Sequence, residues 1–197
     1  MIKLKLATEE DAASILQIYS PFISNTVITF EYEVPTLIEF TNRIINIQEK
    51  YPWLLCEIND NIVGYAYASS FNEREAYKWS ADFSIYIMPQ YHSKNIGKAL
   101  YSALFELLKL QGYYNIYAGV ALPNIKSESF HEALGFKPIG IYKNVGYKLG
   151  NWHDVKWYVF NLQEHLQSPS NPKSIVEINN TVEFKKILQK AEQIILG

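Results

Sequence analysis

The sequence predicts an α/β (α+β) fold in which helices cover both faces of a central mixed β-sheet. Short runs that alternate apolar and polar residues predict strands, and runs with apolar residues at i, i+3, i+4 and i+7 predict amphipathic helices. Along the chain these elements follow the order β-α-α-β-β-β-α-β-α-β-β, which is typical of a mixed sheet with helices packed on it. A chain of 197 residues suits one domain with a short appendage.

Composition and charge exclude several classes of protein. Hydrophobic residues make up 48% of the chain and charged residues 19%, which argues against disorder. The net charge is −2 and no basic run occurs, so no nucleic-acid footprint is present. The single cysteine, Cys56, lies in an apolar run and predicts a buried thiol. Without a signal-peptide pattern or an apolar stretch near the roughly 18 residues of a membrane span, we expect a cytoplasmic protein that binds no membrane.

The first part of the chain should supply one strand and two helices. Alternation over residues 2–6 predicts the strand, Thr8 is the expected N-cap of a helix, and Pro21 should end that helix. Residues 25–32 indicate a loop or a short strand. Thr36 should cap the second helix, whose buried face is expected to carry Phe40, Ile44, Ile45 and Ile47.

Three β-rich runs follow. The runs at 53–58 and 62–69 flank Asn59-Asp60-Asn61, so they predict a hairpin. A polar and aromatic loop at 71–78 leads to the third run, which starts at Trp79 and predicts the central strand.

The next segment joins this central strand to a helix. Pro89 removes a ladder donor and ends the strand, a short polar loop follows at 90–97, and the apolar spacing of residues 99–108 predicts a helix. The free N–H groups of a first helical turn favour an anion, and Lys94 and Lys98 add positive charge. Strand, polar loop and helix in this order therefore predict an anion site.

The later elements have clear end signals. Gly112 is the expected C-cap of the central helix, residues 115–121 predict a strand, and Ser127 should cap a short helix that Gly135 stops. Two further strands are expected at 137–142 and 152–162, around a turn region at 146–150.

The composition changes near residue 166. We expect a domain at 1–165, a linker at 166–180 and an appended helix at 181–197, because Ser168-Pro-Ser-Asn-Pro172 is a linker signal. Thr181 should cap the last helix, whose apolar stripe is expected to pack on the domain or on a partner subunit, so a homodimer is expected. That stripe consists of Phe184, Ile187, Leu188, Ala191, Ile194 and Ile195.

Two segments resemble the motifs of the GNAT superfamily of N-acetyltransferases. The run at 89–100 resembles its acyl-CoA pyrophosphate loop, and the run at 124–136 resembles its second motif. Shorter segments resemble the phosphinothricin and methionine sulfoximine acetyltransferases of that superfamily: 74–79, 122–124, 131–136, 145–148 and 152–155. The resemblance covers about residues 1–165. It implies a mostly antiparallel, twisted sheet and acetyl-CoA-dependent acetylation of an amine, with no metal.

The resemblance also implies where acetyl-CoA binds. The strand edge at Ile85, Tyr86 and Ile87 should bond the pantetheine, and Asn124 should do the same or only cap its loop. The pyrophosphate should rest on backbone N–H groups of His92, Ser93, Lys94, Asn95, Ile96, Gly97 and Lys98. The superfamily loop usually reads Arg/Gln-x-x-Gly-x-Gly/Ala, and here His92, Asn95 and Gly97 occupy those positions. Because asparagine tolerates positive φ, we expect the loop to keep its shape.

Three side chains are candidates for proton transfer. Asp82 occupies the position of the subfamily's catalytic glutamate, so it is either a base that deprotonates the acceptor ammonium or a solvated aspartate at a strand start. It is shorter than glutamate by one methylene, about 1.5 Å. His131 stands where the subfamily has a histidine, and could be a base, an acid, both or structural. Tyr101 could donate to the departing thiolate or only pack.

The resemblance implies a small amino acid or analogue as acceptor, of the phosphinothricin, methionine sulfoximine or methionine sulfone type. Arg74 is either a fork for its carboxylate or a solvated loop charge. The pocket walls could include Phe30, Tyr77, Trp79 and Tyr147. Two alternatives stay open: acetylation of another amine (a polyamine, an antibiotic or a protein N-terminus), and a CoA-binding module without turnover.

Overall fold

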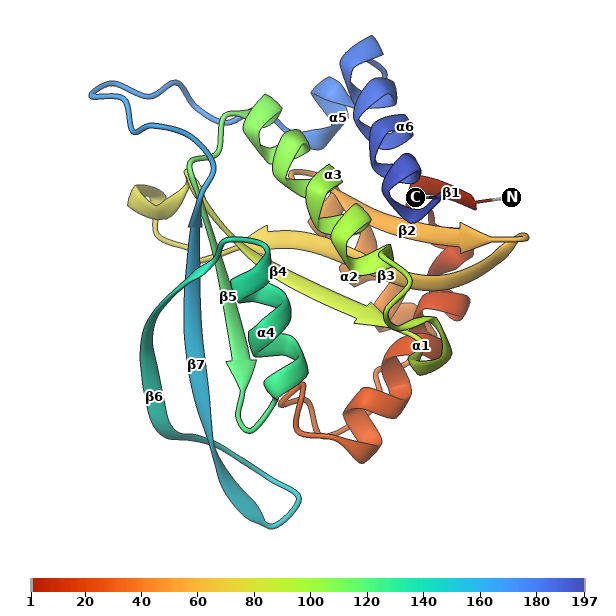
Figure 1. Ribbon diagram of the computed structural model, residues 1–197, viewed down its shortest axis with the longest axis vertical. Helices are drawn as coiled ribbons and strands as arrows, with labels where there is room; N and C mark the ends of the chain where they lie inside the picture. The colour runs from red at the N-terminus through yellow and green to blue at the C-terminus, as the bar shows by residue number, and fades with distance from the viewer. Residues whose placement is uncertain (1, 197) are drawn as a thin grey trace.

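The computed structural model, which describes residues 2–196, contains a seven-stranded sheet with helices on both faces (Figure 1). In spatial order the strands are β1 (Ile2–Leu6), β2 (Trp53–Ile58), β3 (Asn61–Ser70), β4 (Ser80–Ile87), β5 (Asn115–Ala121), β7 (Asn151–Asn161) and β6 (Lys137–Lys148). The pair β4 and β5 is parallel and the other described neighbours are antiparallel, so the predicted mixed, mostly antiparallel sheet is confirmed.

The helices form a layer on each face of the sheet. One layer consists of α1 (Ala12–Asn25) and α2 (Leu37–Gln48), and the other of α3 (Ile96–Gln111), α4 (Ile125–Ala133), α5 (Ile175–Ile178) and α6 (Val182–Leu196) (Figure 1). Short 3₁₀ turns lie at Glu9–Asp11, Glu75–Tyr77 and Pro89–Tyr91. No helix within residues 2–196 is long and apolar enough to cross a membrane.

The alternation of side chains along β2 divides the interior into two cores. Trp53 and Leu55 belong to the core under α1 and α2, whereas Leu54 and Cys56 belong to the core under α3. Cys56 is fully buried, and this burial raises the pKa of its thiol to about 12. The prediction of a buried structural thiol is therefore confirmed.

Two details of the first helices differ from the prediction. Pro21 does not end α1, which continues for four more residues because its apolar face, including the buried Ile23, still packs on the sheet. Thr36 caps α2 as expected, in a reciprocal capping box with Glu39. Ile45, however, is 37% exposed and lies off the buried face of α2.

Most of the other predicted boundaries are confirmed. The β2–β3 hairpin turns at Asn59 and Asp60, which both have positive φ, and β5 has the predicted limits. Gly112 ends α3 and Gly135 follows α4, each in the left-handed conformation. The predicted N-cap of α4 was wrong: Asn124 holds that place and accepts a hydrogen bond from the Ser127 N–H at 3.2 Å.

The last hairpin is longer than predicted. β6 extends through Lys148 instead of ending at residue 142, and the turn to β7 is made by Leu149 and Gly150, both with positive φ. The register of the β6–β7 pair shifts between Pro138 and Gly140 and again between residues 142 and 146. These bulges interrupt the period-two pattern by which a continuous strand is recognised.

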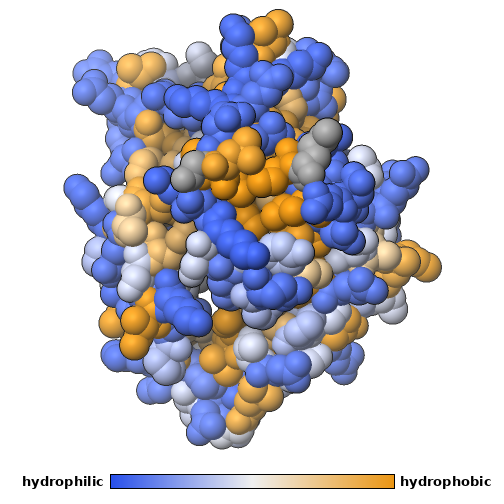
Figure 2. Space-filling model, turned by 45° about the vertical axis from the view of Figure 1, so that its right-hand side comes forward, coloured by the Kyte–Doolittle hydropathy of each residue, from blue (hydrophilic) through white to orange (hydrophobic). Residues whose placement is uncertain are grey.

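The C-terminal segment packs on its own domain. The Leu4 N–H donates to Glu192 of α6 at 2.8 Å, and α6 lies against β1 and α3. The predicted linker contains α5, which Ser174 caps and whose Ile175 and Ile178 are buried. Figure 2 shows apolar side chains that reach the surface in the region where β1 and α6 meet. Of the two arrangements expected for this helix, packing on the domain is the one present.

Candidate active site

The site begins where β4 and β5 separate. The two strands pair only over residues 80–82 and 115–117, and then diverge (Figure 1). The part of β4 from Phe83 to Ile87 therefore has one edge that no described strand pairs. Backbone N–H and C=O groups on such an edge are free to bond a ligand. Ile85, Tyr86 and Ile87, the residues predicted to bond pantetheine, lie on this part of β4.

The loop after β4 exposes the start of α3. Asn95 is the N-cap of α3 in the left-handed conformation (φ 58°), and its side chain makes no capping hydrogen bond. The first-turn N–H groups of α3 therefore stay available to an anion. The predicted positive φ of Asn95 is confirmed, and Ser93 adopts one too (φ 61°). The ring of His92 contacts the Ile87 carbonyl oxygen at 3.0 Å, which ties the loop to the end of β4.

The first turn of α3 packs tightly on α4. A Cβ atom at Gly97 would lie 3.0 Å from the ring of Phe130, so only glycine allows this approach without movement of the ring. Ile96 beside it is buried, whereas Lys98 is exposed. Lys94 lies over the ring of Tyr91, with Nζ 4.8 Å from its centroid.

Asp82 lies in a pocket of about 360 Å³ on the α1 side of the opening. Burial raises the pKa of its carboxyl to about 7, and a hydrogen bond from the Phe83 N–H at 3.1 Å opposes this rise. A carboxyl that titrates near neutral pH can accept a proton and release it again. The pocket is lined by Tyr19, Ile28, Thr29, Phe30, Glu31, Tyr67, Asp82, Phe83, Ser84, Tyr86, Gly119, Ala121, Val155 and Trp157.

His131 and Tyr101 meet on the other side of the sheet, in the core. The Tyr101 hydroxyl lies 3.2 Å from Nε2 of His131, and Nδ1 of the ring lies 2.7 Å from the Ser127 carbonyl oxygen. Both side chains are buried, and burial lowers the pKa of His131 and raises that of Tyr101. The charge of Asp82 also raises the pKa of Tyr101.

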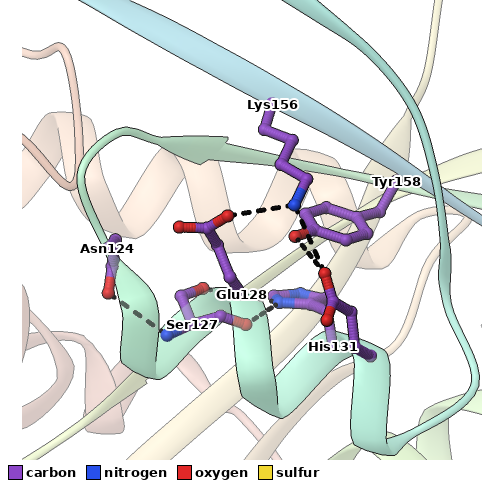
Figure 3. Close-up of polar contacts among 7 residues, drawn as sticks. Asn124, Ser127, Glu128, His131, Lys156 and Tyr158 are labelled. Carbon is purple, nitrogen blue, oxygen red and sulfur yellow. Dashed lines mark hydrogen bonds and ion pairs between the residues drawn. The ribbon is translucent and has the colours of Figure 1, made fainter.

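Helix α4 is fixed to β7 by a polar cluster (Figure 3). Lys156 donates to Glu128 at 3.0 Å and to Glu132 at 3.3 Å, and the Tyr158 hydroxyl donates to Glu132 at 3.1 Å. The ring of Tyr158 stacks on His131. This cluster holds the orientation of α4, and with it the position of the imidazole.

The α1–α2 loop and the β6–β7 hairpin together close one side of the pocket. Lys148 is buried and its ammonium donates to the carbonyl oxygens of Ile23 and Thr29, each at 2.7 Å. Phe30, a predicted wall residue, lines the pocket and packs against Gly146. Lys148 therefore ties the β6–β7 hairpin to the α1–α2 region.

Four predicted acceptor-site residues do not line this pocket. Arg74 is exposed at the start of a 3₁₀ turn, and Tyr77 packs on Phe71. The indole of Trp79 donates to the Ser170 carbonyl at 2.8 Å and so binds the C-terminal segment. Tyr147 lies exposed on the hairpin.

Several residues that do line the pocket carried no sequence signal, above all Tyr19, Glu31 and Trp157. They come from α1, the α1–α2 loop and β7, and no local spacing relates them. No cluster of three His, Cys, Asp or Glu side chains within residues 2–196 could hold a metal ion.

The family model of the acetyltransferase (GNAT) domain matches residues 4–157. The chain belongs to the GNAT acetyltransferase family. It is 30% identical over 174 residues to a phosphinothricin N-acetyltransferase of Streptomyces viridochromogenes, covering 88% of this chain and 93% of that protein. It is 26% identical to an L-methionine sulfoximine/L-methionine sulfone acetyltransferase of Salmonella typhimurium, and the match covers 82% of this chain and 95% of that protein.

A solved structure of this family is also similar. The GNAT superfamily phosphinothricin acetyltransferase from Sinorhizobium meliloti, in complex with acetyl-CoA, has a TM-score of 0.82 and 33% identity, covering 86% of this chain and 93% of that chain. The predicted superfamily and fold are confirmed. As a GNAT enzyme, the chain is an N-acetyltransferase and thus an acyltransferase.

Proposed function

We propose that this enzyme transfers the acetyl group of acetyl-CoA to the amine of a small amino acid or analogue. The observation that carries the proposal is the position of Asp82, which lies where β4 and β5 separate and also lines the pocket on the α1 side. An acyl donor on the free β4 edge and an amine in the pocket would meet at this carboxyl. The names of the relatives support an amino-acid analogue as acceptor.

In this proposal the chain's residues bind the donor and move protons. First-turn amides of α3 and the Ser93–Lys98 loop would hold the pyrophosphate of acetyl-CoA, which supplies an activated acyl group. Asp82 would take a proton from the acceptor ammonium, directly or through water, so that the neutral nitrogen can attack. The Tyr101 hydroxyl would donate its proton to the departing thiolate and regain one from water after the products leave, and Nε2 of His131 would orient that hydroxyl by accepting its hydrogen bond in the resting enzyme.

Asn124 has a smaller part in this scheme. Its side-chain oxygen already accepts the Ser127 N–H as the N-cap of α4, so its amide nitrogen is the group left for pantetheine.

The two alternatives differ from this proposal in their measurable consequences. A binding module without turnover needs no base, whereas Asp82 combines burial with a pKa near 7 in the pocket. The names of the relatives, and not the volume of the pocket, favour an amino-acid analogue over a larger amine.

A CoA-release assay with acetyl-CoA and a panel of amino acids and polyamines tests the proposal. We expect thiol release with small amino acids, little with polyamines, and loss of release in Asp82→Asn. Calorimetry with acetyl-CoA serves as the binding control. Binding without release for every acceptor would contradict the proposal.

We also propose that the enzyme is a cytoplasmic homodimer. Acetyl-CoA is a cytoplasmic metabolite, and edge strand β6 exposes Ile139, Ile141, Tyr142 and Val145, an apolar surface of the kind that marks an interface. Since α6 is already packed on its own domain, β6 is the better candidate. Light scattering should give twice the chain mass, and Ile141→Glu should lower it; a monomeric wild type would contradict this.

A further inference from the structure

Aromatic rings form a large part of the wall of the acceptor pocket, and we call this part the aromatic chamber: Tyr19, Phe30, Tyr67, Tyr86 and Trp157. The ring of Phe83 instead packs on Tyr101 and Phe105 in the core on the other face of the sheet. Ile28, Ala121 and Val155 add apolar surface. The charged groups on its wall are two carboxylates, Asp82 and Glu31. Rings of this kind stabilise an ammonium ion through their negative faces and also bury apolar substituents.

The two carboxylates differ in their hydrogen-bond and ion-pair partners. Glu31 accepts hydrogen bonds from Arg43 at 2.7 and 3.3 Å and from the Tyr19 hydroxyl at 2.8 Å, so its charge is balanced and its position fixed. Asp82 accepts a hydrogen bond from the Phe83 N–H and forms no ion pair with another side chain of residues 2–196. The acceptor ammonium therefore finds its counter-charge at Asp82.

An amino acid with its amine at Asp82 has two branches to place. One enters the aromatic chamber and the other points to the open mouth of the pocket. An acceptor with one anion can turn its α-carboxylate outward. An acceptor with an anion on both branches must bring one of them among the rings and toward Asp82 and Glu31, where desolvation and like charge both oppose it.

From this geometry we infer that the preferred acceptor carries an uncharged side chain, apolar or aromatic or with a neutral polar end, and that acceptors with a second anion, such as phosphinothricin, are disfavoured. This inference rests on the proposed function, because it assumes that the amine reacts at Asp82. It assigns to Glu31 and Arg43 a part in specificity.

The decisive measurement compares acceptors of similar size that differ in side-chain charge. Glutamine against glutamate and methionine sulfone against phosphinothricin each hold the α-amine and α-carboxylate constant. We expect kcat/KM, measured by CoA release, to be at least about tenfold higher for the neutral member of each pair. Equal or higher kcat/KM for the anionic members overturns the inference and leaves the proposed function standing. No release with any amino acid overturns both.

A variant tests the part assigned to the ion pair. Glu31→Gln keeps the side-chain shape and leaves the Arg43 guanidinium unneutralised beside the pocket, so the neutral-to-anionic ratio of kcat/KM should fall by roughly tenfold. Glu33→Gln makes the same charge change at an exposed position two residues away and should leave the ratio within about twofold. The same ratio in Glu31→Gln as in wild type would overturn the role of this pair.

Discussion

The hydroxyl of Tyr101 lies 3.2 Å from Nε2 of His131, and the contact of the other ring nitrogen decides the direction of this hydrogen bond. Nδ1 lies 2.7 Å from the carbonyl oxygen of Ser127, which can only accept a hydrogen bond, so Nδ1 carries the proton. Burial lowers the pKa of the ring and keeps it neutral, so Nε2 accepts from the tyrosine. In the proposed mechanism His131 therefore orients the Tyr101 hydroxyl.

If the two residues act as one unit, the effects of losing them should not be additive. We expect Tyr101→Phe and His131→Gln each to lower kcat by about tenfold or more, and the double variant to be no worse than the poorer single. Tyr158→Phe is the control, because this residue stacks on His131 but directs its hydroxyl to Glu132. It should keep nearly full kcat. Additive losses in the double-variant cycle would argue for two separate roles.

The pH dependence of the reaction should follow Asp82. A base must be deprotonated to work, and burial raises the pKa of this carboxyl to about 7. Hence kcat/KM should rise as pH increases through about 7 and then level off. Asp82→Asn should lower kcat by about 10²–10⁴-fold and abolish the rise of kcat/KM with pH. Asp82→Glu keeps a carboxyl and should keep this rise of kcat/KM with pH. If the rise persists in Asp82→Asn, a group other than Asp82 is responsible for it.

The buried carboxyl of Asp82 should lower the free energy of unfolding at neutral and higher pH. Its folded pKa is raised from 3.8 to about 7, so the folded state holds a proton that the unfolded state has lost between those pH values. The free energy of unfolding should therefore fall as pH rises from about 4 to 7 and stay low above it. Asp82→Asn should be more stable than wild type at pH 8, by a few kcal/mol at most, and equal to it near pH 4. Urea unfolding at both pH values decides this; equal stability at pH 8 would contradict it.

The sequence was sufficient to predict the conformation of the segment that is proposed to bind the donor, because that segment is local. Strand, loop and helix from Asp82 to Leu108 are contiguous, and asparagine at position 95 is a residue type that accepts positive φ. The period-two and 3.6-residue patterns also placed most elements. Pro21 and the bulged β6 escaped this reasoning because tertiary packing and register shifts override local patterns.

The acceptor side could not be predicted in the same way. Its wall joins α1, the α1–α2 loop, β4 and β7, so residues such as Tyr19 and Trp157 become neighbours only after folding. Trp79 shows the reverse case. It is a plausible wall residue by position, yet its indole N–H bonds Ser170 in a C-terminal segment whose path the sequence does not specify.

Loss of Lys148 should weaken binding of the acceptor rather than binding of acetyl-CoA. Its buried ammonium bonds two carbonyl oxygens of the α1–α2 region, and Lys148→Met would leave both without their donor. We expect a loss of about 1–3 kcal/mol in unfolding free energy and a higher KM for the acceptor, with the KM for acetyl-CoA changed little. Lys143→Met, which removes an exposed partner of Asp154, is the control and should alter neither KM. Equal increases in both KM values would mean a general loss of structure.

The ring of Phe30 packs so closely on Gly146 that no side chain fits at position 146. A Cβ atom at position 146 would overlap the Phe30 ring, so Gly146→Ala must displace that ring or the hairpin. Because Phe30 lines the pocket, the KM for the acceptor should rise at least fivefold or so, with a stability loss of about 1–3 kcal/mol. Gly140 lies in the same strand, and a Cβ atom there would have no atom within 4 Å. Gly140→Ala should therefore leave the KM for the acceptor and the stability near their wild-type values. Thermal unfolding and acceptor kinetics on the two variants check this, and similar acceptor KM values for both would show that the ring does not shape the pocket.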